Sequence, residues 1–594
     1  MTGRHTAGLD IKVAGTSFLP EIADVLAWAS VEEDGRTSAK AEIGFRDPRN
    51  ASLFKKSRIA LGSAVELTAI TPSGPVPLFS GEVTECEARA STEVSGRSGH
   101  TGGVMTVIRA RDLSHRLRRG RRTAAYPGMT AGKVVEKVAE RAGVTGLSVD
   151  DTGFSYEYLS QPSMSDWDFL SHLARENGRD LYVRDGKLHF RKREGSGGEA
   201  VALRFGDNLV NVRLAASLGH QVPSVEVRGW DREKKVAIAS VHTPRRDGTW
   251  KSPVSSSHYA PMALTGLPRR HRAEAAAVAE SMAHEVAAGL VRLHAVVHGE
   301  PRLRLRSAVT LTGLGPQFGG RFTVTGVRHH FHPVQGYRTE LTVDEGVDRS
   351  AGQPGDAEEG LRRVRGFVRG KVVDINDPEE RGRVRVKLEW LGEKYETTWA
   401  ETVQLSGSLG HGVVLPEVDD VVAVVFEQGC LDSPLVVGAV DDPIDKVGHT
   451  MPLVDGGRGG KGRTNLRTFA SKDGHRLELV DKNGRGMGAT LITGGEGSEA
   501  GGLRIQLDAS KTVISIDSKG RVEIKGAKGV SVDAGSGPLQ LKGNSVTVTA
   551  DKDISLKGVN VDMNASARLK AHGAKAEFSG SAVAELKAPM VKIN

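Results

Sequence analysis

A chain of 594 residues is too long for one hydrophobic core, and at roughly 150 residues per domain it should form three or four domains. Its net charge of +8, from 81 Lys and Arg against 73 Asp and Glu, is too evenly balanced to indicate nucleic-acid binding. The two cysteines, Cys86 and Cys430, are far apart and have no CxxC partner, which argues against a disulfide framework or a zinc cluster.

The start of the chain carries no apolar stretch that resembles a signal peptide. The longest strongly apolar run, Val421–Phe426, is far shorter than the roughly 18 residues that a membrane span needs. We therefore expect synthesis and assembly in the cytoplasm. The 73 glycines and an aromatic content of only 5% favour a β-rich segment with repeated tight turns.

Residues 9–118 alternate apolar and polar side chains, for example over 64–68 and 81–84, with Pro72 and Gly74 between them. This pattern predicts a β-domain at the start of the chain. Two short helices follow. Thr130 precedes a periodic apolar run, and Ser165 precedes a second one with an acidic residue three positions later, so each is an expected N-cap.

A hairpin and a longer helix complete the first region. Asp185-Gly186 separates two apolar segments, 181–183 and 188–190, which is typical of a two-residue β-hairpin turn. An Ala-rich helix is predicted over 273–290, followed by more strands. Residues 351–356 contain Pro and Gly without an apolar pattern, so we place a linker there and assign 1–355 to one region.

Residues 356–445 are predicted to form a small β-barrel, for which about eighty residues are enough. Val384, Val386, Leu388 and Trp390 are expected on one face of a strand, and Val421–Phe426 is expected to be buried on both faces. A Gly-rich joint is expected over 446–475.

The last region, 476–594, repeats a short apolar-x-apolar unit, from Ile514-Ser515-Ile516 to Val561-Asp562-Met563. The second apolar residues recur every 7 to 9 positions, which indicates a repeat architecture. They are Ile516, Ile524, Val532, Leu541, Val548, Leu556 and Met563.

One such unit offers two apolar side chains, too few to offset the entropy of ordering a short strand alone. We therefore predict a trimer whose chains wrap into a three-sided β-prism, with those seven residues along its axis. Val591, Ile593 and Asn594 would form its tip. A single-chain β-solenoid remains the alternative, although its coils usually need roughly 20 residues.

Taken in order, several motifs resemble the VgrG-type spike family, which includes phage late control D proteins. In the first region they are 78–83 (LFSGEV), 165–170 (SDWDFL), 227–231 (VRGWD) and 320–327 (GRFTVTGV), and later 382–386 (GRVRV), 415–420 (LPEVDD), 434–438 (PLVVG) and 471–478 (SKDGHRLE). The resemblance implies a multidomain, mainly β protein. Its parts would be an α+β hub with two tube-like barrels, an OB-fold barrel and a C-terminal trimeric β-helix needle.

The resemblance also implies a function. The chain would be the structural spike and hub of a phage-tail-like contractile injection system, connecting inner tube and baseplate to a membrane-piercing tip, and not an enzyme. Its implied partners are two more copies, the inner tube protein, baseplate proteins, a PAAR-like tip protein, effector cargo and, transiently, the target membrane. The particle would assemble in the cytoplasm and then be released or propelled. The alternative is a secreted β-helix protein that binds or degrades polysaccharide.

Three groups of residues are candidates for chemistry or binding, and none predicts a catalytic, metal or cofactor site. His329, His330 and His332 alternate along a strand without an acidic or Cys partner nearby, and His294 and His298 have helix-like spacing without the His-Glu-x-x-His pattern. An arginine cluster without interleaved aromatic residues is expected to be a solvated or subunit-contact face. It comprises Arg109, Arg111, Arg116, Arg118, Arg119, Arg121 and Arg122.

Overall fold

The computed structural model consists of two compact units, Met1–Val447 and Gly448–Asn594. The structure describes residues 8–17, 25–35, 37–47, 59–91, 103–193, 199–231, 234–245, 258–265, 271–315, 317–344, 364, 366–405, 413–440, 454–455, 462–481, 487–494 and 502–593. The predicted linker at 351–356, residues 446–453 and 456–461 of the Gly-rich joint and the tip residue Asn594 lie outside these residues.

The largest element of the first unit is an eleven-stranded sheet. Its strands are β1 (Gly8–Val13), β2 (Thr16–Ser17), β3 (Leu26–Asp34), β4 (Lys40–Asp47), β5 (Ala64–Thr71), β6 (Gly74–Ser91), β7 (Gly103–Arg111), β16 (Leu209–Ala216), β20 (Val291–His298), β23 (Gly326–His332) and β24 (Gly336–Val343). They pair in the order β16-β20-β24-β23-β3-β4-β7-β6-β5-β1-β2.

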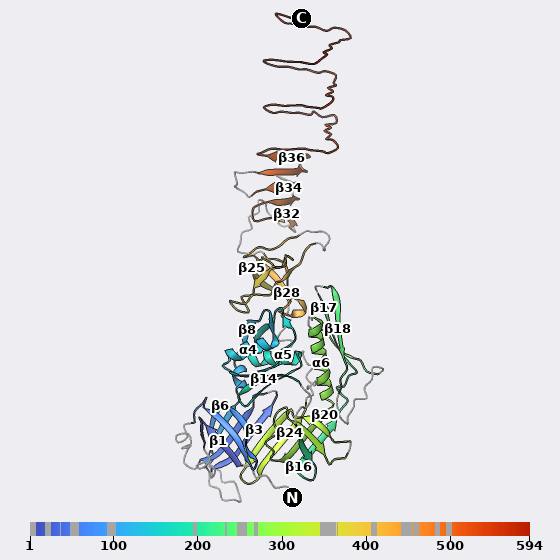
Figure 1. Ribbon diagram of the computed structural model, residues 1–594. Coiled ribbons are helices and arrows are strands. Elements are labelled where there is room, and N and C mark those ends of the chain that lie inside the picture. The colour runs from blue at the N-terminus through green and yellow to red at the C-terminus, as the bar shows by residue number, and fades with distance from the viewer. Residues whose placement is uncertain are drawn as a thin grey trace. The chain divides into compact units, whose positions relative to one another are not determined.

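This sheet joins two parts of the chain that are far apart in sequence. Strand β23 pairs antiparallel with β3, so that Phe331 lies opposite Ala29 and Gly326 lies opposite Asp34. The two halves curve side by side, one blue and one yellow-green in Figure 1. Each has its own core, one around Phe45 and one around Phe322. The expected β-domain at 9–118 is therefore one half of a larger sheet.

A mixed α/β segment lies between the two halves in sequence. It contains α3 (Ser114–Leu117), β8 (Arg122–Ala125), β9 (Met129–Thr130), α4 (Ala131–Arg141), β10 (Gly146–Val149), β11 (Ser155–Tyr156), β12 (Ser160–Met164), α5 (Asp166–Glu176), β13 (Arg179–Arg184) and β14 (Lys187–Lys192). The predicted caps are confirmed, because Thr130 accepts from the Lys133 N–H and Ser165 accepts from the Asp168 N–H.

The predicted hairpin is also confirmed. Strands β13 and β14 pair in continuous register from Arg179–Lys192 to Arg184–Lys187. Asp185 and Gly186 have φ of 50° and 72°, the left-handed conformations that this tight turn requires.

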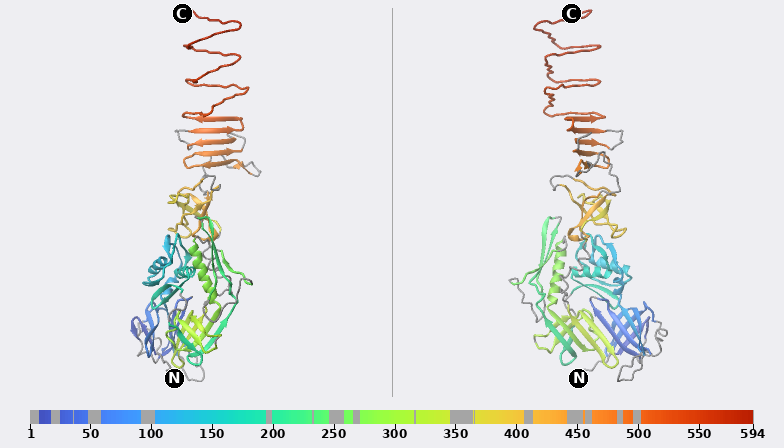
Figure 2. Two further views of the ribbon diagram at one scale, coloured as in Figure 1. Left: turned by 45° about the vertical axis from the view of Figure 1, so that its right-hand side comes forward. Right: turned by 180° about the vertical axis from the view of Figure 1, so that it is seen from behind.

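The remaining elements of the first unit before the barrel, in the region called the hub, are one long helix and two three-stranded sheets, β15-β21-β22 and β18-β17-β19. These are β15 (Val201–Arg204), β17 (Val225–Asp231), β18 (Val236–His242), β19 (Met262–Leu264), α6 (Arg272–Ala288), β21 (Ala308–Thr312) and β22 (Gly320–Thr323). Helix α6 is the predicted Ala-rich helix, and Val278, Met282 and Val286 on it pack against the β18-β17-β19 sheet. In Figure 2 it runs beside that sheet.

The barrel is a five-stranded sheet in the order β26-β25-β28-β29-β27. Its strands are β25 (Val368–Asp374), β26 (Arg385–Lys387), β27 (Glu401–Thr402), β28 (Val421–Phe426) and β29 (Pro434–Ala439). The short 3-10 helix η2 (Glu427–Gly429) lies between β28 and β29. Val384, Val386 and Leu388 are buried as predicted.

Two expectations for the barrel were wrong. Trp390 is 53% exposed, because the strand has already ended at Lys387 and Trp390 lies in a turn. Strand β28 buries only alternate residues, Val422, Val424 and Phe426, because one face of this small barrel faces outward.

Hydrogen bonds attach the barrel to the mixed α/β segment. The Ser160 hydroxyl lies 2.9 Å from the Tyr395 hydroxyl and donates to Asp432, and the Tyr158 hydroxyl donates to the Glu396 carbonyl. Burial raises the pKa of Tyr158 to about 12, so its hydroxyl stays protonated and able to donate. The barrel and the hub therefore form one unit.

The second unit begins with β30 (Val454–Asp455) and β31 (Arg463–Thr464), which pair with each other. A five-stranded antiparallel sheet follows, β32 (Leu466–Ala470), β33 (Arg476–Val480), β34 (Gly488–Thr493), β35 (Leu503–Asp508) and β36 (Val513–Ser518), paired in chain order. From 519 to 593 the described chain is extended and forms no further strand (Figure 2).

Candidate assembly interface

The extended segment 519–593, called the needle segment below, forms no strand ladder with any described part of its own chain. Its backbone–backbone hydrogen bonds, in the described residues, are confined to turns, Gly529 to Gly526 and Gly537 to Ala534. Every residue from 519 to 593 is exposed. Extended backbone carries a donor and an acceptor at each residue, and these groups need partners when the apolar side chains beside them are removed from water. The segment therefore has the features of one strand of an intermolecular structure.

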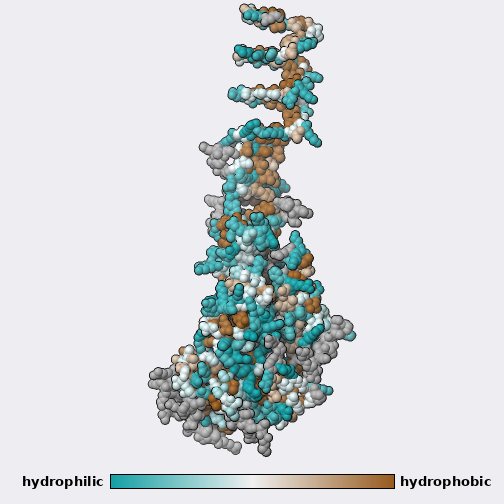
Figure 3. All heavy atoms as spheres, viewed as in Figure 1, coloured by the Kyte–Doolittle hydropathy of each residue, from teal (hydrophilic) through white to brown (hydrophobic). Residues whose placement is uncertain are grey.

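The predicted axial residues all present their side chains to solvent in the single chain. Their exposures run from 57% for Ile516 to 74% for Leu541. Figure 3 shows apolar side chains as a brown band along the second unit, where a soluble monomer would place polar ones. At the predicted tip Val591 is 47% and Ile593 is 89% exposed, while Asn594 lies outside the described residues.

The structure divides the predicted repeat region into two kinds of segment. Ile516 lies in β36 and pairs with Ile505 of β35, within the same chain. The other six predicted axial residues lie in the needle segment, where the described chain forms no ladder. The repeat pattern does not distinguish these two modes of pairing. The unequal spacing of the strands before residue 513 is the one sequence feature that marks where pairing within the chain ends.

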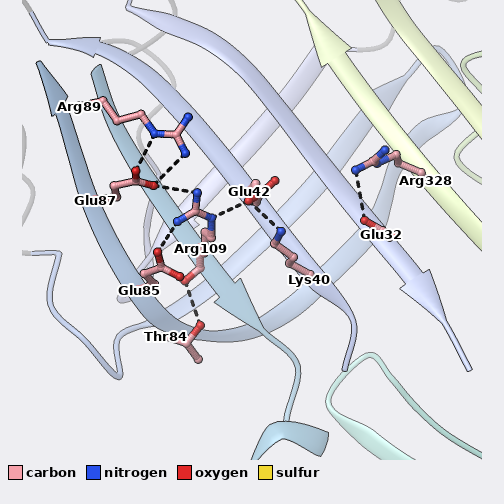
Figure 4. Close-up of polar contacts among 9 residues, drawn as sticks. All are labelled: Glu32, Lys40, Glu42, Thr84, Glu85, Glu87, Arg89, Arg109 and Arg328. Atoms are coloured by element: carbon pink, nitrogen blue, oxygen red, sulfur yellow. Dashed lines mark hydrogen bonds and ion pairs between the residues drawn. The ribbon is translucent and has the colours of Figure 1, made fainter. Parts of the chain in front are cut away.

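The hub sheet carries a network of charged residues on its outer face (Figure 4). Arg109 on β7 contacts Glu42 at 2.6 Å, Glu87 at 2.8 Å and also Glu85. A hydrogen bond from Arg89, assisted by Arg109, lowers the pKa of Glu87 to about 2. Because these charges neutralise one another, this face is not a site for a polyanion.

Three other members of the arginine cluster have partners on other elements. Arg116 contacts Glu82, the Arg118 guanidinium lies 4.3 Å from the centre of the Trp167 ring, and Arg122 is 3.5 Å from Asp166. These partners come from β6 and α5, so residues adjacent in sequence point to different places. Arg109, Arg116, Arg118 and Arg122 therefore do not form one basic patch.

The histidines have structural surroundings. His329 is fully buried, with Nε2 donating to the Leu303 carbonyl at 2.9 Å and Nδ1 accepting from the Tyr337 hydroxyl at 2.8 Å. His330 and His332 lie on the opposite face, as the alternation predicted. His294 and His298 are on strand β20, so the helix-like reading of their spacing was wrong, and His294 pairs with Glu340 at 2.6 Å.

Burial lowers the pKa of His329 to about 4, the nearby Glu33 raising it and Arg304 lowering it. An unfolded histidine takes up its proton near pH 6.5, whereas the folded one does so near pH 4. Hub stability should therefore be unaffected above pH 6.5 and should fall by roughly 3 kcal/mol between pH 6.5 and 4 from this group.

The measurement is the hub unfolding free energy against pH for the native chain and for His329→Gln. Asp112, whose pKa burial raises to about 6, acts in the opposite direction in both proteins, so the difference between the two curves isolates His329. We expect that difference to shrink as the pH falls. A constant offset across the pH range would contradict the prediction.

A cavity of about 300 Å³ lies between α6 and the end of α5. Its charged lining residues are Arg179, Lys192, Arg193 and the single carboxylate Glu280, with His284 beside them. Glycoside hydrolysis normally uses two carboxylates, so the cavity does not support the polysaccharide-degrading alternative. Among the described residues no group of three or more His, Cys, Asp or Glu is placed to hold a metal ion, and no helix there is long and apolar enough to cross a membrane.

Two family models match parts of the chain. Residues 368–440, the barrel, match the type VI secretion system/phage-baseplate injector OB domain. Residues 49–332 match a family described as the Alg8 N-terminal domain, a description that assigns no activity. No curated protein matches the chain.

Solved structures cover most of the chain. The half-lidded Francisella PdpA-VgrG complex has a TM-score of 0.51 at 8% identity and covers 87% of this chain and 88% of its own. The lidless form of the PdpA-VgrG complex has a TM-score of 0.50 at 8% identity and covers 87% and 99%. The E. coli c3393 protein, a component of the type VI secretion system, has a TM-score of 0.46 at 16% identity and covers 72% and 99%. The first two likenesses concern the fold, and they span both units.

Proposed function

We propose that this chain, which has the VgrG-type fold of hub, OB-fold barrel and needle, is the central spike of a contractile injection system. The observation that carries the proposal is the needle segment, in which every described residue is exposed and a continuous apolar band needs other chains to cover it. The injector OB-domain match of the barrel supports the same machine class.

A trimer is the simplest assembly that covers the apolar side chains of the needle segment and pairs its backbone groups. Each unit of the repeat has two apolar side chains, and a threefold axis lets equivalent residues of three chains meet while backbone groups pair between neighbours. A single-chain solenoid would stack successive coils of one chain through hydrogen bonds. The described needle segment contains no such ladder, which counts against that alternative.

The proposed role is mechanical. A narrow rod whose backbone is bonded between three chains resists unfolding, because the chains must separate together. The hub would meet the inner tube and baseplate, and a PAAR-like tip protein would cap Val591, Ile593 and Asn594 before contact with the target membrane. Because the Francisella VgrG was solved with PdpA, we also expect an effector-like partner here. The particle would assemble in the cytoplasm of the producing cell.

The mass in solution tests the proposal. Light scattering should give three copies for the full chain, and the trimer should resist SDS without heating. A chain shortened to end at Asp455 lacks the sheet and the needle segment, so its assemblies should lose SDS resistance. A full-length chain that stays monomeric at micromolar concentration would overturn the proposal.

A further inference from the structure

The sheet β32–β36 differs from the needle segment in how its backbone is satisfied. Its five strands pair through four antiparallel ladders, all within one chain. The strands follow one another directly, so every pairing is local in sequence and carries a small entropy cost of loop closure. This sheet is therefore able to form in one chain before other copies arrive, whereas the needle segment is not.

One face of this sheet is apolar and uncovered. In register across the strands lie two columns, called the apolar ladder below. The first is Leu477, Leu491, Ile505 and Ile516, and the second is Leu479, Ala489, Leu507 and Ile514. The large residues of the ladder are between 39% (Leu479) and 73% (Ile514) exposed. On β32 the first column continues with Phe469 and the second with Arg467, whose charge is paired with Asp481 at 2.5 Å.

The opposite face has a polar central column and different burial. Its central column is Thr468, Glu478, Thr490, Gln506 and Ser515. Glu478 is 8% and Thr490 is 4% exposed, although they are polar. The face of the sheet that is open to solvent is thus the apolar one, whereas a stable monomer would bury its apolar face.

The apolar ladder continues directly into the repeat of the needle segment. Ile514 and Ile516, the last members of the two columns, are also the first unit of the octad pattern. The band in Figure 3 runs without a break over both segments. Whatever covers the needle segment must therefore also cover the ladder, and a further copy of this chain has the matching surface.

The octad pattern alone does not fix how three chains align. Its units recur every 7 to 9 residues, so sliding one chain by one unit again places apolar residues on apolar residues. The sheet breaks this degeneracy, because its second column begins on β32 with Arg467, and a slide by one strand would place that guanidinium against Leu479 of another chain. Three copies of the ladder match in one alignment.

We propose that β32–β36 is a trimerisation clamp, which folds within each chain, joins three copies through the apolar ladder and sets the register in which the needle segments then wrap. This inference rests on the proposed trimeric spike and adds the order of assembly and the surface that starts it. It predicts that the clamp has affinity of its own and that the needle segment depends on it.

Shortened chains test the first part. A chain ending at Ser518 keeps the clamp, and one ending at Asp455 lacks it. In sedimentation experiments we expect the trimer of the longer chain to dissociate at a concentration at least tenfold lower than the assemblies of the chain ending at Asp455. Ile505→Glu in the chain ending at Ser518 should remove that difference, and Gln506→Glu, one residue away on the polar face, should leave it intact. Equal dissociation of the two shortened chains would overturn the clamp.

Refolding of the full chain tests the second part. After dilution from denaturant, Ile505→Glu should lower the yield of SDS-resistant trimer at least tenfold, while Gln506→Glu refolds like the native chain. A native yield for Ile505→Glu would overturn the clamp and leave the trimeric spike standing. A full chain that is monomeric before any substitution would overturn the proposed function instead, so the two failures are distinguishable.

Discussion

Val532→Asp should abolish the SDS-resistant trimer, whereas Ser531→Asp should leave it intact. In the single chain both positions are exposed, so neither substitution disturbs a contact within it. In a three-sided prism, however, neighbouring residues of a strand point to opposite faces, and Val532 meets its two equivalents at the axis. Three carboxylates would then converge in a space without water or cations. Each such unpaired charge costs several kcal/mol, so the expected loss is on the order of 10 kcal/mol per trimer.

The two variants carry the same added charge one residue apart, which removes net charge and composition as explanations. Unheated and heated samples compared by SDS gel electrophoresis give the trimer fraction, and circular dichroism of the hub reports any general misfolding. If both variants kept the trimer, Val532 would not be axial and the prism would be wrong. If both lost it, the segment would be sensitive to charge on either face, as a two-sided packed coil would be.

Local features of the fold were predictable from sequence because their causes are local. Thr130 and Ser165 cap helices through hydrogen bonds to residues three positions on, and Asp185-Gly186 adopts a turn that needs positive φ. The needle segment was predictable for a related reason. A repeat of two apolar residues with no core of its own implies a partner, whatever the rest of the chain does.

Features that depend on pairing across the sequence were not predictable. His294 and His298 have helical spacing, but they lie on β20 because that strand pairs with β16 and β24, and no local signal records this. The arginine cluster around Arg109 looked basic because its partners, such as Glu42, come from other strands. The repeat analysis assigned 476–518 to the same prism as the needle segment, because an apolar-x-apolar strand has the same pattern whether it pairs within its chain or between chains.

Glu33→Gln should lower the free energy of unfolding of the hub by about 3 kcal/mol, because it leaves the buried Arg304 guanidinium with only Asp185, a more distant carboxylate at 3.5 Å that is 55% exposed. Glu33, on β3, accepts from Arg304 Nε at 2.8 Å and from the Leu305 N–H at 2.9 Å. The side chains of Glu33 and Arg304 are 6% and 12% exposed. Glutamine keeps the shape of the side chain and can still accept the hydrogen bond from the Leu305 N–H. The loss of unfolding free energy therefore reports the charge of the carboxylate.

The neighbouring residue supplies the control. Glu32 points to the other face of β3 and contacts Arg328 at 3.3 Å, with side chains 46% and 49% exposed (Figure 4). Water screens this pair, so Glu32→Gln should change the unfolding free energy by less than about 1 kcal/mol. Calorimetry of the full chain, following the hub transition, gives both values. Equal effects of the two substitutions would contradict the prediction.

The Glu33–Arg304 pair also bears on how force passes through the hub. It joins β3 of the first half to residues 304–305, which precede β21, a strand that packs in the core of the second half, and Arg304 donates further to the Pro77 carbonyl at 2.7 Å, on β6. The two halves are otherwise joined in the sheet by the single ladder between β3 and β23. A rod driven from the hub would load that ladder. Glu33→Gln should therefore increase hydrogen exchange at β3 and β23 before it does so at β5 or β20, because the second connection between the halves has been weakened.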